Sequence, residues 1–407
     1  MQKPRGTRDL FGKEILRYQE ITSKLRGILE SYGYKEIRTP TFEHKEVFLG
    51  GEDDFLLSNK EIFHIEGGKY ILRPENTASV ARAVCENKLI HTEVLPLQYY
   101  YLGSFFRYER PQKGRYREFT QFGVEKIGSS AIEDDLEIIL LVSEIISRFG
   151  LNLELSLNYL GSKEVKEAWN EQLKNYFLPF REQLSVASRE RINSNPLRIL
   201  DDHEDSKLDL VKNAPSIKSF FSNRDRENIA RIGDFLKEFG ISFNWDPALV
   251  RGIDYYTGLI YEWKYKDLTV IAGGRYDELF NGFGESIPSL GFAIGIERFK
   301  DLLEECGYSW EHKEQRPIYI ASLLGLDIAL LEVISTIRNN GFVVKTNWGI
   351  NNIKKHIKRA IALKSKAILI YGDKERAEGR VTIKDLDSQL EVSTSLGDME
   401  TLIKHLS

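Results

Sequence analysis

A basic turn between two predicted strands limits the possible folds of this 407-residue chain more than any other feature. Five cations lie within residues 107–117, around a turn at 111–114. Sequential strands that are joined by a turn pair in the antiparallel sense. The helices of the chain do not alternate strictly with strands, as they do in doubly wound parallel folds. The pattern therefore predicts a mixed α+β core with an antiparallel sheet.

The residues after this turn put several functional groups on one face of a strand. Because successive side chains point to opposite faces, the shared face carries Arg115, Arg117, Phe119, Gln121, Gly123 and Glu125. Guanidinium groups bind polyphosphate and an aromatic ring stacks on a base, so this order suits a nucleotide beside a small polar molecule. The alternative is a solvated basic hairpin, although the five cations face only two acids, Glu109 and Glu118.

Length, charge and cysteine content narrow the class of protein. A chain of this length divides into two or three domains. A formal charge of −4 and a pI near 6.1 exclude a protein that grips nucleic acid through bulk positive charge. Two distant cysteines, Cys85 and Cys306, argue against a disulfide framework and a structural zinc site. The sequence shows neither a signal peptide nor a membrane-spanning run, so we expect a soluble cytoplasmic protein.

Changes in pattern along the chain predict its domains. Residues 1–161 and 241–306 combine strands and helices, and the polar, helical residues 162–240 between them resemble an insertion. A polar linker at 307–316 leads to a separate small α/β domain at 317–407. The predicted helices are 13–32, 78–84, 134–149, 326–340 and 351–363; the predicted strands include 34–40, 70–73, 151–157, 243–265, 317–323, 342–346 and 367–371.

Two segments carry polar residues where a core strand would be apolar. Residues 251–256, Arg-Gly-Ile-Asp-Tyr-Tyr, place a charged pair and two phenols in a strand that otherwise reads as buried, which costs stability in a core. The structural alternative is that Asp254 simply neutralises Arg251. Residues 73–77, Arg-Pro-Glu-Asn-Thr, read equally well as an ordinary helix start that is capped by the asparagine or the threonine.

Glycine-rich segments at 272–277 and 289–299 lack the spacing of a phosphate-binding loop and are explained equally by tight turns and close packing. Arg298 gives the second segment more weight. It lies at a predicted strand-to-helix junction, where a cation can meet a bound anion beside helix amide groups. A purely structural arginine is the alternative.

The remaining charged residues suggest RNA rather than a metal. The seven histidines are scattered without metal-ligand spacing, so no metal site is predicted. In the last domain, a basic helix face carries Lys354, Lys355, Lys358, Arg359, Lys364 and Lys366, and Ile353, Ile357 and Ile361 form an apolar stripe. Most such faces are merely solvated, but on an appended domain of an acidic protein this face favours contact with RNA.

Together these segments resemble the class II aminoacyl-tRNA synthetases, and specifically the histidyl-tRNA synthetase family. The helix at 13–32 with the strand ending at Pro40 is similar to the first class motif, residues 106–125 to the second and 291–298 to the third. The histidine-specific signatures are Leu72–Thr77, Arg251–Tyr256 and Ala272–Asp277. Two residues depart from the family pattern, Asn76 in place of a frequent glycine and Thr120 in place of an aromatic residue or histidine.

The resemblance implies a fold and a reaction. The fold is an antiparallel six-stranded catalytic sheet, an inserted helical domain and a C-terminal α/β anticodon-binding domain. The reaction is the ATP-dependent ligation of L-histidine to tRNA(His), in which the histidine carboxylate attacks the α-phosphorus of ATP and a ribose hydroxyl of the tRNA then captures the histidyl-adenylate. It also implies a homodimer and Mg²⁺ that arrives with ATP.

The resemblance assigns roles to individual residues. The catalytic cations are Arg107 and Arg251. The ATP-binding residues are Arg107, Glu109, Arg115, Phe119 and Arg298. The histidine-binding residues are Glu75, Thr77, Gln121, Glu125, Arg251, Tyr255 and Tyr256, with Glu75 and Thr77 at the ammonium group and Glu125 and Tyr256 at the imidazole. Gln112 and Arg117 are expected at the acceptor end of the tRNA.

Two other functions fit the same fold. One is a catalytically inactive paralogue that serves as the regulatory subunit of ATP phosphoribosyltransferase. That protein needs neither the 251–256 signature nor a terminal α/β domain. The other is an ATP-dependent ligase that forms an amide and never meets tRNA, which has no use for residues 317–407.

Overall fold

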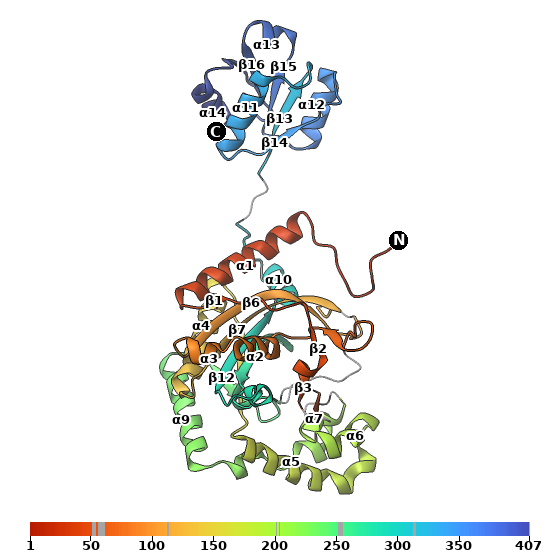
Figure 1. Cartoon of the computed structure of the whole chain (residues 1–407), viewed down its shortest axis with the longest axis vertical. Coiled ribbons are helices and arrows are strands. Elements are labelled where there is room, and N and C mark those ends of the chain that lie inside the picture. The colour runs from red at the N-terminus through yellow and green to blue at the C-terminus, as the bar shows by residue number, and fades with distance from the viewer. Residues whose placement is uncertain are drawn as a thin grey trace. The chain divides into compact units, whose positions relative to one another are not determined.

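The computed structural model describes residues 1–50, 54–55, 62–111, 114–200, 202, 204–250, 255–311 and 315–406. The chain forms two compact units, Met1–Glu311 and His312–Ser407 (Figure 1). Among the described residues, no helix is both long enough and apolar enough to cross a bilayer.

The first unit is built on one large sheet. Counted over the described residues, this sheet has eight strands in the order β1 (Lys35–Glu36), β6 (Leu97–Phe106), β7 (Glu118–Ile127), β12 (Ser289–Gly295), β11 (Leu268–Arg275), β10 (Thr257–Tyr265), β8 (Glu154–Tyr159) and β9 (Phe243–Trp245). The run from β6 to β8 is antiparallel throughout, which confirms the predicted sheet. The short edge strands β1 and β9 each pair in the parallel sense.

The basic turn joins β6 to β7, as the sequence predicts. The register runs from Leu97 opposite Ile127 to Phe106 opposite Glu118. The predicted alternation is wrong for Arg115 and Arg117, because β7 begins only at Glu118. There the backbone N–H of Arg117 donates to the carbonyl of Gly6, 2.8 Å away, so the N-terminal segment takes the place of a ladder partner.

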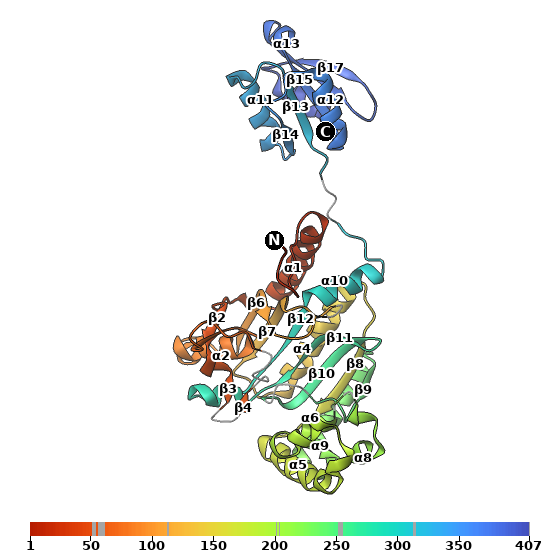
Figure 2. The same cartoon turned by 90° about the vertical axis from the view of Figure 1, so that its right-hand side faces the viewer.

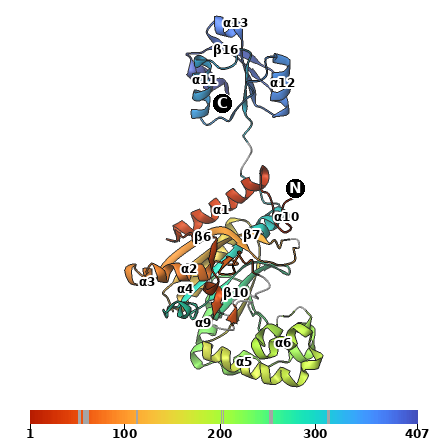
Figure 3. The ribbon, with the colours of Figure 1, turned by 45° about the vertical axis from the view of Figure 1, so that its right-hand side comes forward.

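Helices cover the sheet on both faces. The predicted helices 13–32 and 134–149 are confirmed as α1 (Lys13–Ser31) and α4 (Ile132–Arg148). α10 (Ile296–Glu305) follows β12 directly and lies beside α1 (Figure 3). α4 and α10 meet where the rings of Phe149 and Phe299 stand edge to face, 4.9 Å between centroids. α2 (Thr77–Glu86) lies on the other face, since its first residue contacts the opposite side of β7 from the side that α4 contacts.

The segment between β8 and β9, which the sequence predicts to be an insertion, is helical in its described residues. It contains α5 (Lys163–Phe177), α6 (Val186–Ser194), α7 (Leu197–Leu200), α8 (Asp209–Lys212) and α9 (Asn223–Glu238). α5 buries Trp169, Leu173 and Phe177 against its neighbours, so the insertion has an apolar interior. Its helices gather at one end of the sheet (Figure 2).

Smaller elements complete the first unit. The predicted strand at 70–73 is β5 (Tyr70–Leu72), which pairs with β2 (Phe42–His44) outside the large sheet. β3 (Leu49–Gly50) pairs with β4 (Asp54–Phe55), and α3 (Leu89–Thr92) follows α2. The predicted strand at 34–40 is reduced to the two residues of β1.

The second unit is a small α/β domain. Over its described residues it holds a five-stranded sheet in the order β14 (Val344–Thr346), β13 (Ile318–Ser322), β15 (Ala367–Tyr371), β16 (Arg380–Asp385) and β17 (Glu391–Ser395). β13 pairs with β14 and with β15 in the parallel sense, whereas β16 pairs with β15 and with β17 in the antiparallel sense. The helices are α11 (Ile328–Asn339), α12 (Ile353–Ala362), α13 (Asp373–Ala377) and α14 (Met399–Leu406).

α12 carries four of the six basic residues that the sequence singles out; the prediction is wrong for Lys364 and Lys366, which follow the end of the helix at Ala362. His356 and Ala360 are its buried residues, and Ile353 and Ile357 pack beside them. The predicted apolar stripe is wrong at Ile361, which is 60% exposed. Lys354, Lys355, Lys358 and Arg359 are exposed, so the basic face points to solvent.

Candidate active site

A pocket on the α2 face of the large sheet collects most of the predicted site residues. It is lined by Glu75, Thr77, Tyr101, Arg107, Gln121, Glu125, Tyr255, Tyr256, Ala272, Tyr276, Gly291, Phe292 and Ala293. These residues come from the loop before α2 and from β6, β7, β11 and β12, with the segments that flank β6, β10 and β11. The structure therefore brings the predicted histidine-binding residues together. The exception is Arg251, which lies outside the described residues, as does its suggested partner Asp254.

Small residues form the floor of this pocket. Ala272, Ala293 and Gly123 stand opposite one another across β11, β12 and β7. A Cβ atom at Gly123 would overlap the ring of Tyr101, and one at Gly291 would overlap the carboxylate of Glu125. Glycine is required at Gly123 because the Tyr101 ring crosses over it, and at Gly291 because the backbone carbonyl of Val124 and the Glu125 carboxylate both lie too close for a Cβ atom.

Glu75 is both a pocket residue and a helix cap. It is buried, and its carboxylate accepts hydrogen bonds from the backbone N–H groups of Thr77 at 2.5 Å and Ala78 at 3.1 Å. The prediction that Asn76 or Thr77 caps α2 is wrong, because the Glu75 side chain satisfies these N–H groups instead. Burial raises the pKa of Glu75, which the two N–H donors oppose.

The loop that carries Glu75 is held from behind by Arg73. This arginine is buried, and it donates to the carbonyls of Ser104 at 3.1 Å and Thr39 at 2.9 Å. Asn76 directs its Oδ1 to the same region, where it accepts from the hydroxyl of Thr39 at 2.6 Å. Asn76, which departs from the family pattern, therefore contacts Thr39, the same residue that Arg73 binds.

Glu125 is the most enclosed acid of the pocket, with 2% of its surface exposed. Its Oε1 accepts from the hydroxyl of Thr77 at 2.8 Å, and its Oε2 accepts from the phenol of Tyr276. Burial raises the pKa of Glu125 to about 8, and the two hydroxyl donors only partly offset this. A carboxyl group and a phenol are thereby held side by side at the base of the pocket.

The sequence pattern did not single out two of the pocket phenols. Tyr276 lies inside the 272–277 signature, so the motif could have pointed to it. The sequence instead predicts Tyr256 as the phenol that binds the imidazole together with Glu125. Tyr256 lines the same pocket, with its ring 4.9 Å from that of Tyr255. Tyr101 comes from β6 and stands opposite Gly123, a relation that only the strand register reveals.

The raised pKa of Glu125 predicts a pH-dependent cost to stability. The unfolded chain ionises this carboxyl near pH 4.5, whereas the folded protein resists ionisation until about pH 8. Stability from this group is therefore present below pH 4.5 and is lost as the pH rises toward 8. We expect the unfolding free energy of Glu125→Gln, taken relative to that of the wild type, to increase by a few kcal/mol between pH 5 and 8.5.

Urea denaturation of the ligand-free proteins at both pH values measures this margin. Other titrating groups are common to the two proteins, so their contributions cancel in the difference. A margin that is constant with pH would show that Glu125 ionises normally in the folded protein.

Arginines gather beside the acidic end of the pocket. Arg107 donates from Nε to the carbonyl of Pro74 at 3.0 Å, and its guanidinium lies 5.2 Å from the ring centroid of Phe119. Arg298 stands in the first turn of α10, at the predicted strand-to-helix junction, and donates to the carbonyl of Gly114 at 3.2 Å. Burial, and then the nearby charge of Arg115, lower the pKa of Arg298. Such a cluster attracts a polyanion.

Contacts within the turn hold three further predicted residues, Glu109, Arg115 and Arg117. Glu109 lies 3.9 Å from the exposed Arg115. Arg117 stacks on the ring of Tyr108 at 4.1 Å and donates to the Glu109 carbonyl at 3.1 Å. Its role at the tRNA remains a prediction, and Gln112 lies outside the described residues.

An antiparallel sheet that presents a carboxylate-lined pocket next to clustered arginines is the catalytic arrangement of a class II aminoacyl-tRNA synthetase. The comparison with known families identifies the member. Residues 6–299 match the family described as Histidyl-tRNA synthetase, and residues 326–406 match the Anticodon binding domain. The chain belongs to the histidyl-tRNA synthetase family.

Individual relatives agree with this membership. A histidine–tRNA ligase of Streptococcus pyogenes serotype M1 is 38% identical over 419 residues, which cover 100% of this chain and 98% of the relative. The apo structure of the histidyl-tRNA synthetase of S. aureus is 30% identical, with a TM-score of 0.79 over 100% of this chain and 99% of that one.

One structural neighbour bears on the alternative function. A Bacillus halodurans protein described as an ATP phosphoribosyltransferase regulatory subunit/histidyl-tRNA synthetase is 22% identical, with a TM-score of 0.64 over 91% of this chain and 98% of that one. At this identity the likeness concerns the fold alone.

Proposed function

We propose that this chain is the ATP-dependent ligase that joins L-histidine to tRNA(His) through a histidyl-adenylate. The observation that carries the proposal is the buried pair of Glu125 and Tyr276 at the base of a pocket whose rim bears Arg107. An imidazole has two ring nitrogens, and a carboxyl group and a phenol can each bind one. Another side chain in this place leaves buried polar groups unpaired, at roughly 1–3 kcal/mol per group.

The two acids of the pocket bind different groups of histidine: Glu125 binds the imidazole and Glu75 binds the ammonium group. Glu75 lies at the N-terminal end of α2 and is the carboxylate for the ammonium group, with the hydroxyl of Thr77 beside it. Gln121 lines the pocket between the acids and the arginines and steadies the substrate, and Tyr255 and Tyr256 close the pocket. Histidine then points its carboxylate toward Arg107.

The reaction brings two anions together, so cations supply most of the catalysis. Arg107 and Arg251 hold the histidine carboxylate and the α-phosphate for in-line attack, and pyrophosphate leaves from the opposite side. Arg115 and Arg298 hold the outer phosphates. Adenine lies between Phe119 and Arg298, with Glu109 near its amino group. The role of Arg251 follows from the resemblance of its segment.

Synthetases of this family use ATP together with a divalent metal ion. We propose Mg²⁺, which enters as part of the substrate MgATP. Within the described residues, no three His, Cys, Asp or Glu side chains lie close enough to form a metal site. Mg²⁺ that arrives with ATP takes most of its ligands from phosphate oxygens and water.

The other partners follow from surfaces away from the pocket. The exposed basic face of α12 and the basic turn, with Gln112 and Arg117, are the proposed tRNA contacts. A second copy of the chain is the proposed partner of α1 and the segment that ends at Pro40. We place the enzyme in the cytoplasm, where the free thiols of Cys85 and Cys306 stay reduced.

Pyrophosphate exchange with each of the twenty amino acids tests the function. We expect ATP–pyrophosphate exchange with histidine alone, followed by charging of tRNA(His). Exchange with no amino acid would favour the regulatory paralogue. Exchange with aspartate would favour the amide-forming ligase.

A further inference from the structure

Each member of the Glu125–Tyr276 pair has a buried cation as its neighbour in the chain. Lys126 follows Glu125, and Arg275 precedes Tyr276; their side chains are only 5% and 8% exposed. Because adjacent residues of a strand point to opposite faces, the cations lie behind the sheet when the acid and the phenol lie in the pocket.

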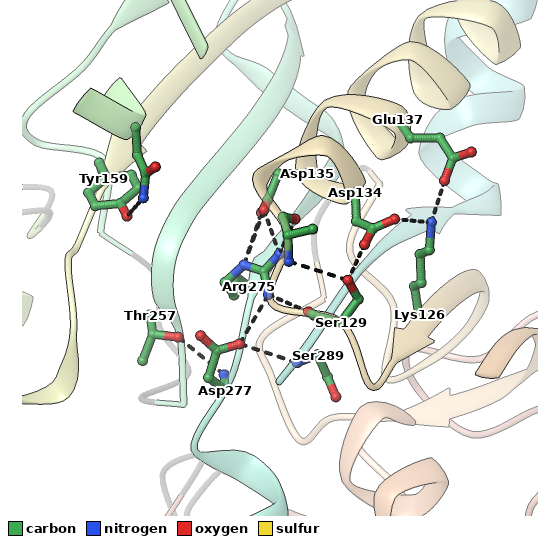
Figure 4. A network of polar contacts seen from close by, with 12 residues as sticks. Lys126, Ser129, Asp134, Asp135, Glu137, Tyr159, Thr257, Arg275, Asp277 and Ser289 are labelled. Carbon is green, nitrogen blue, oxygen red and sulfur yellow. Dashed lines mark hydrogen bonds and ion pairs between the residues drawn. The ribbon is translucent and has the colours of Figure 1, made fainter. Parts of the chain in front are cut away.

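The charged groups of both cations contact acids in the first turn of α4. Arg275 donates from Nη2 at 2.5 Å and from Nε at 3.1 Å to Oδ2 of Asp135. Lys126 forms ion pairs with Asp134 and Glu137. Figure 4 shows the two consecutive aspartates of α4 reaching down to the two strands. One helical turn therefore holds β7 and the end of β11 at the same time.

Further hydrogen bonds join these ion pairs into one network. The carbonyl of Ser129 accepts from Arg275 Nη1 at 2.7 Å, and its hydroxyl donates to Asp134. Asp277 accepts from Arg275 Nη1 at 3.3 Å and from the backbone N–H of Ser289 at 3.2 Å (Figure 4). The network thus reaches β12 as well, so all three strands below the pocket are tied to α4.

The spacing of these strands decides whether Glu125 and Tyr276 meet. β12 lies between β7 and β11, so the two residues start from strands roughly 10 Å apart. The phenol reaches the carboxylate across Gly291, where a Cβ atom would overlap the carboxylate. A contact that spans an intervening strand depends on the twist and separation of both outer strands.

We propose that Asp135, Arg275, Lys126 and Asp134 form a clamp that positions Glu125 and Tyr276 for recognition of the imidazole. These residues touch the back of the sheet and act through their chain neighbours, so they are positioning residues. The proposal rests on the proposed function, since it concerns the same histidine pocket. A buried ion pair adds little stability compared with apolar residues of the same size, whereas its directional bonds restrict geometry.

The variant Asp135→Asn tests the clamp. It keeps the size of the side chain but loses the charge that holds Arg275. We expect the Kd for histidine, measured by titration calorimetry, and the KM for histidine in exchange to rise about tenfold, because small displacements in a site are costly. The KM for ATP should stay within twofold. Glu133→Gln removes a 59% exposed acid from the same turn and serves as the matched control.

The outcomes separate the clamp from simple stability and from the proposed function. A lowered melting temperature with unchanged histidine binding would overturn the clamp alone. A wild-type protein that binds no histidine would overturn the proposed function and the clamp with it. If Asp135→Asn does not fold, Asp134→Asn is judged by the same criteria, because Asp134 holds Lys126 and its side chain is 18% exposed.

Discussion

We expect replacement of Arg107 by glutamine to lower the rate of histidine-dependent pyrophosphate exchange by about 10²- to 10³-fold. This guanidinium is fixed at the Pro74 carbonyl and beside Phe119, so it needs no reorganisation when charge moves to the leaving pyrophosphate. Loss of one such preorganised group has a cost of this size. The Kd for histidine changes much less, because the acids at the base of the pocket remain. Single-turnover adenylate formation and histidine titration measure the two effects separately.

The same substitution at an exposed arginine controls for charge. Arg148, at the end of α4, pairs with Glu144 and has no contact with the pocket residues in the described structure. Arg148→Gln should leave exchange unchanged. Arg107→Lys retains the charge but loses the forked geometry, so an intermediate rate is expected. Exchange by Arg107→Gln within threefold of the wild type would remove Arg107 from the catalytic scheme.

Local periodicity accounts for the part of the fold that could be predicted. The apolar stripe of α1, with Ile21, Leu25 and Ile28 buried, and the pairing of β6 with β7 around the turn both depend on residues near in sequence. The same holds for Glu125, which alternation along β7 places on the pocket face. By contrast, the bounds of the predicted strands at 34–40 and 243–265 are wrong, because β1 has only two residues and β9 only three, which is too short for a period to define.

Strand order and register account for what could not be predicted. Tyr276 and Glu125 are 151 residues apart and come from strands that are separated by β12. Neither the alternation of side chains along a strand nor a sequence motif predicts which phenol crosses over Gly291. The acids of α4 read as an ordinary acidic first turn, which stabilises any helix. Their function as partners of Lys126 and Arg275 becomes visible only when the helix is seen against the back of the sheet.

The Glu125→Ala variant has the largest expected effect on recognition of the amino acid. Its removal leaves the hydroxyls of Thr77 and Tyr276 without their buried acceptor and deprives the imidazole of its carboxyl partner. Each unpaired buried group costs roughly 1–3 kcal/mol, so we expect the KM for histidine to rise about 100-fold. The KM for ATP should change less than threefold, because the arginines that hold the phosphates stay in place.

Two further variants distinguish recognition from general damage to the sheet. Glu125→Gln keeps an oxygen acceptor of the same shape, so its KM for histidine should lie between those of the wild type and Glu125→Ala. Glu154→Gln removes an exposed acid from β8 of the same sheet and should change neither KM. Equal increases in the KM for histidine and for ATP would refute the assignment of Glu125 to the imidazole, since a carboxyl group buried at the base of the amino-acid pocket can affect ATP only by distorting the whole site.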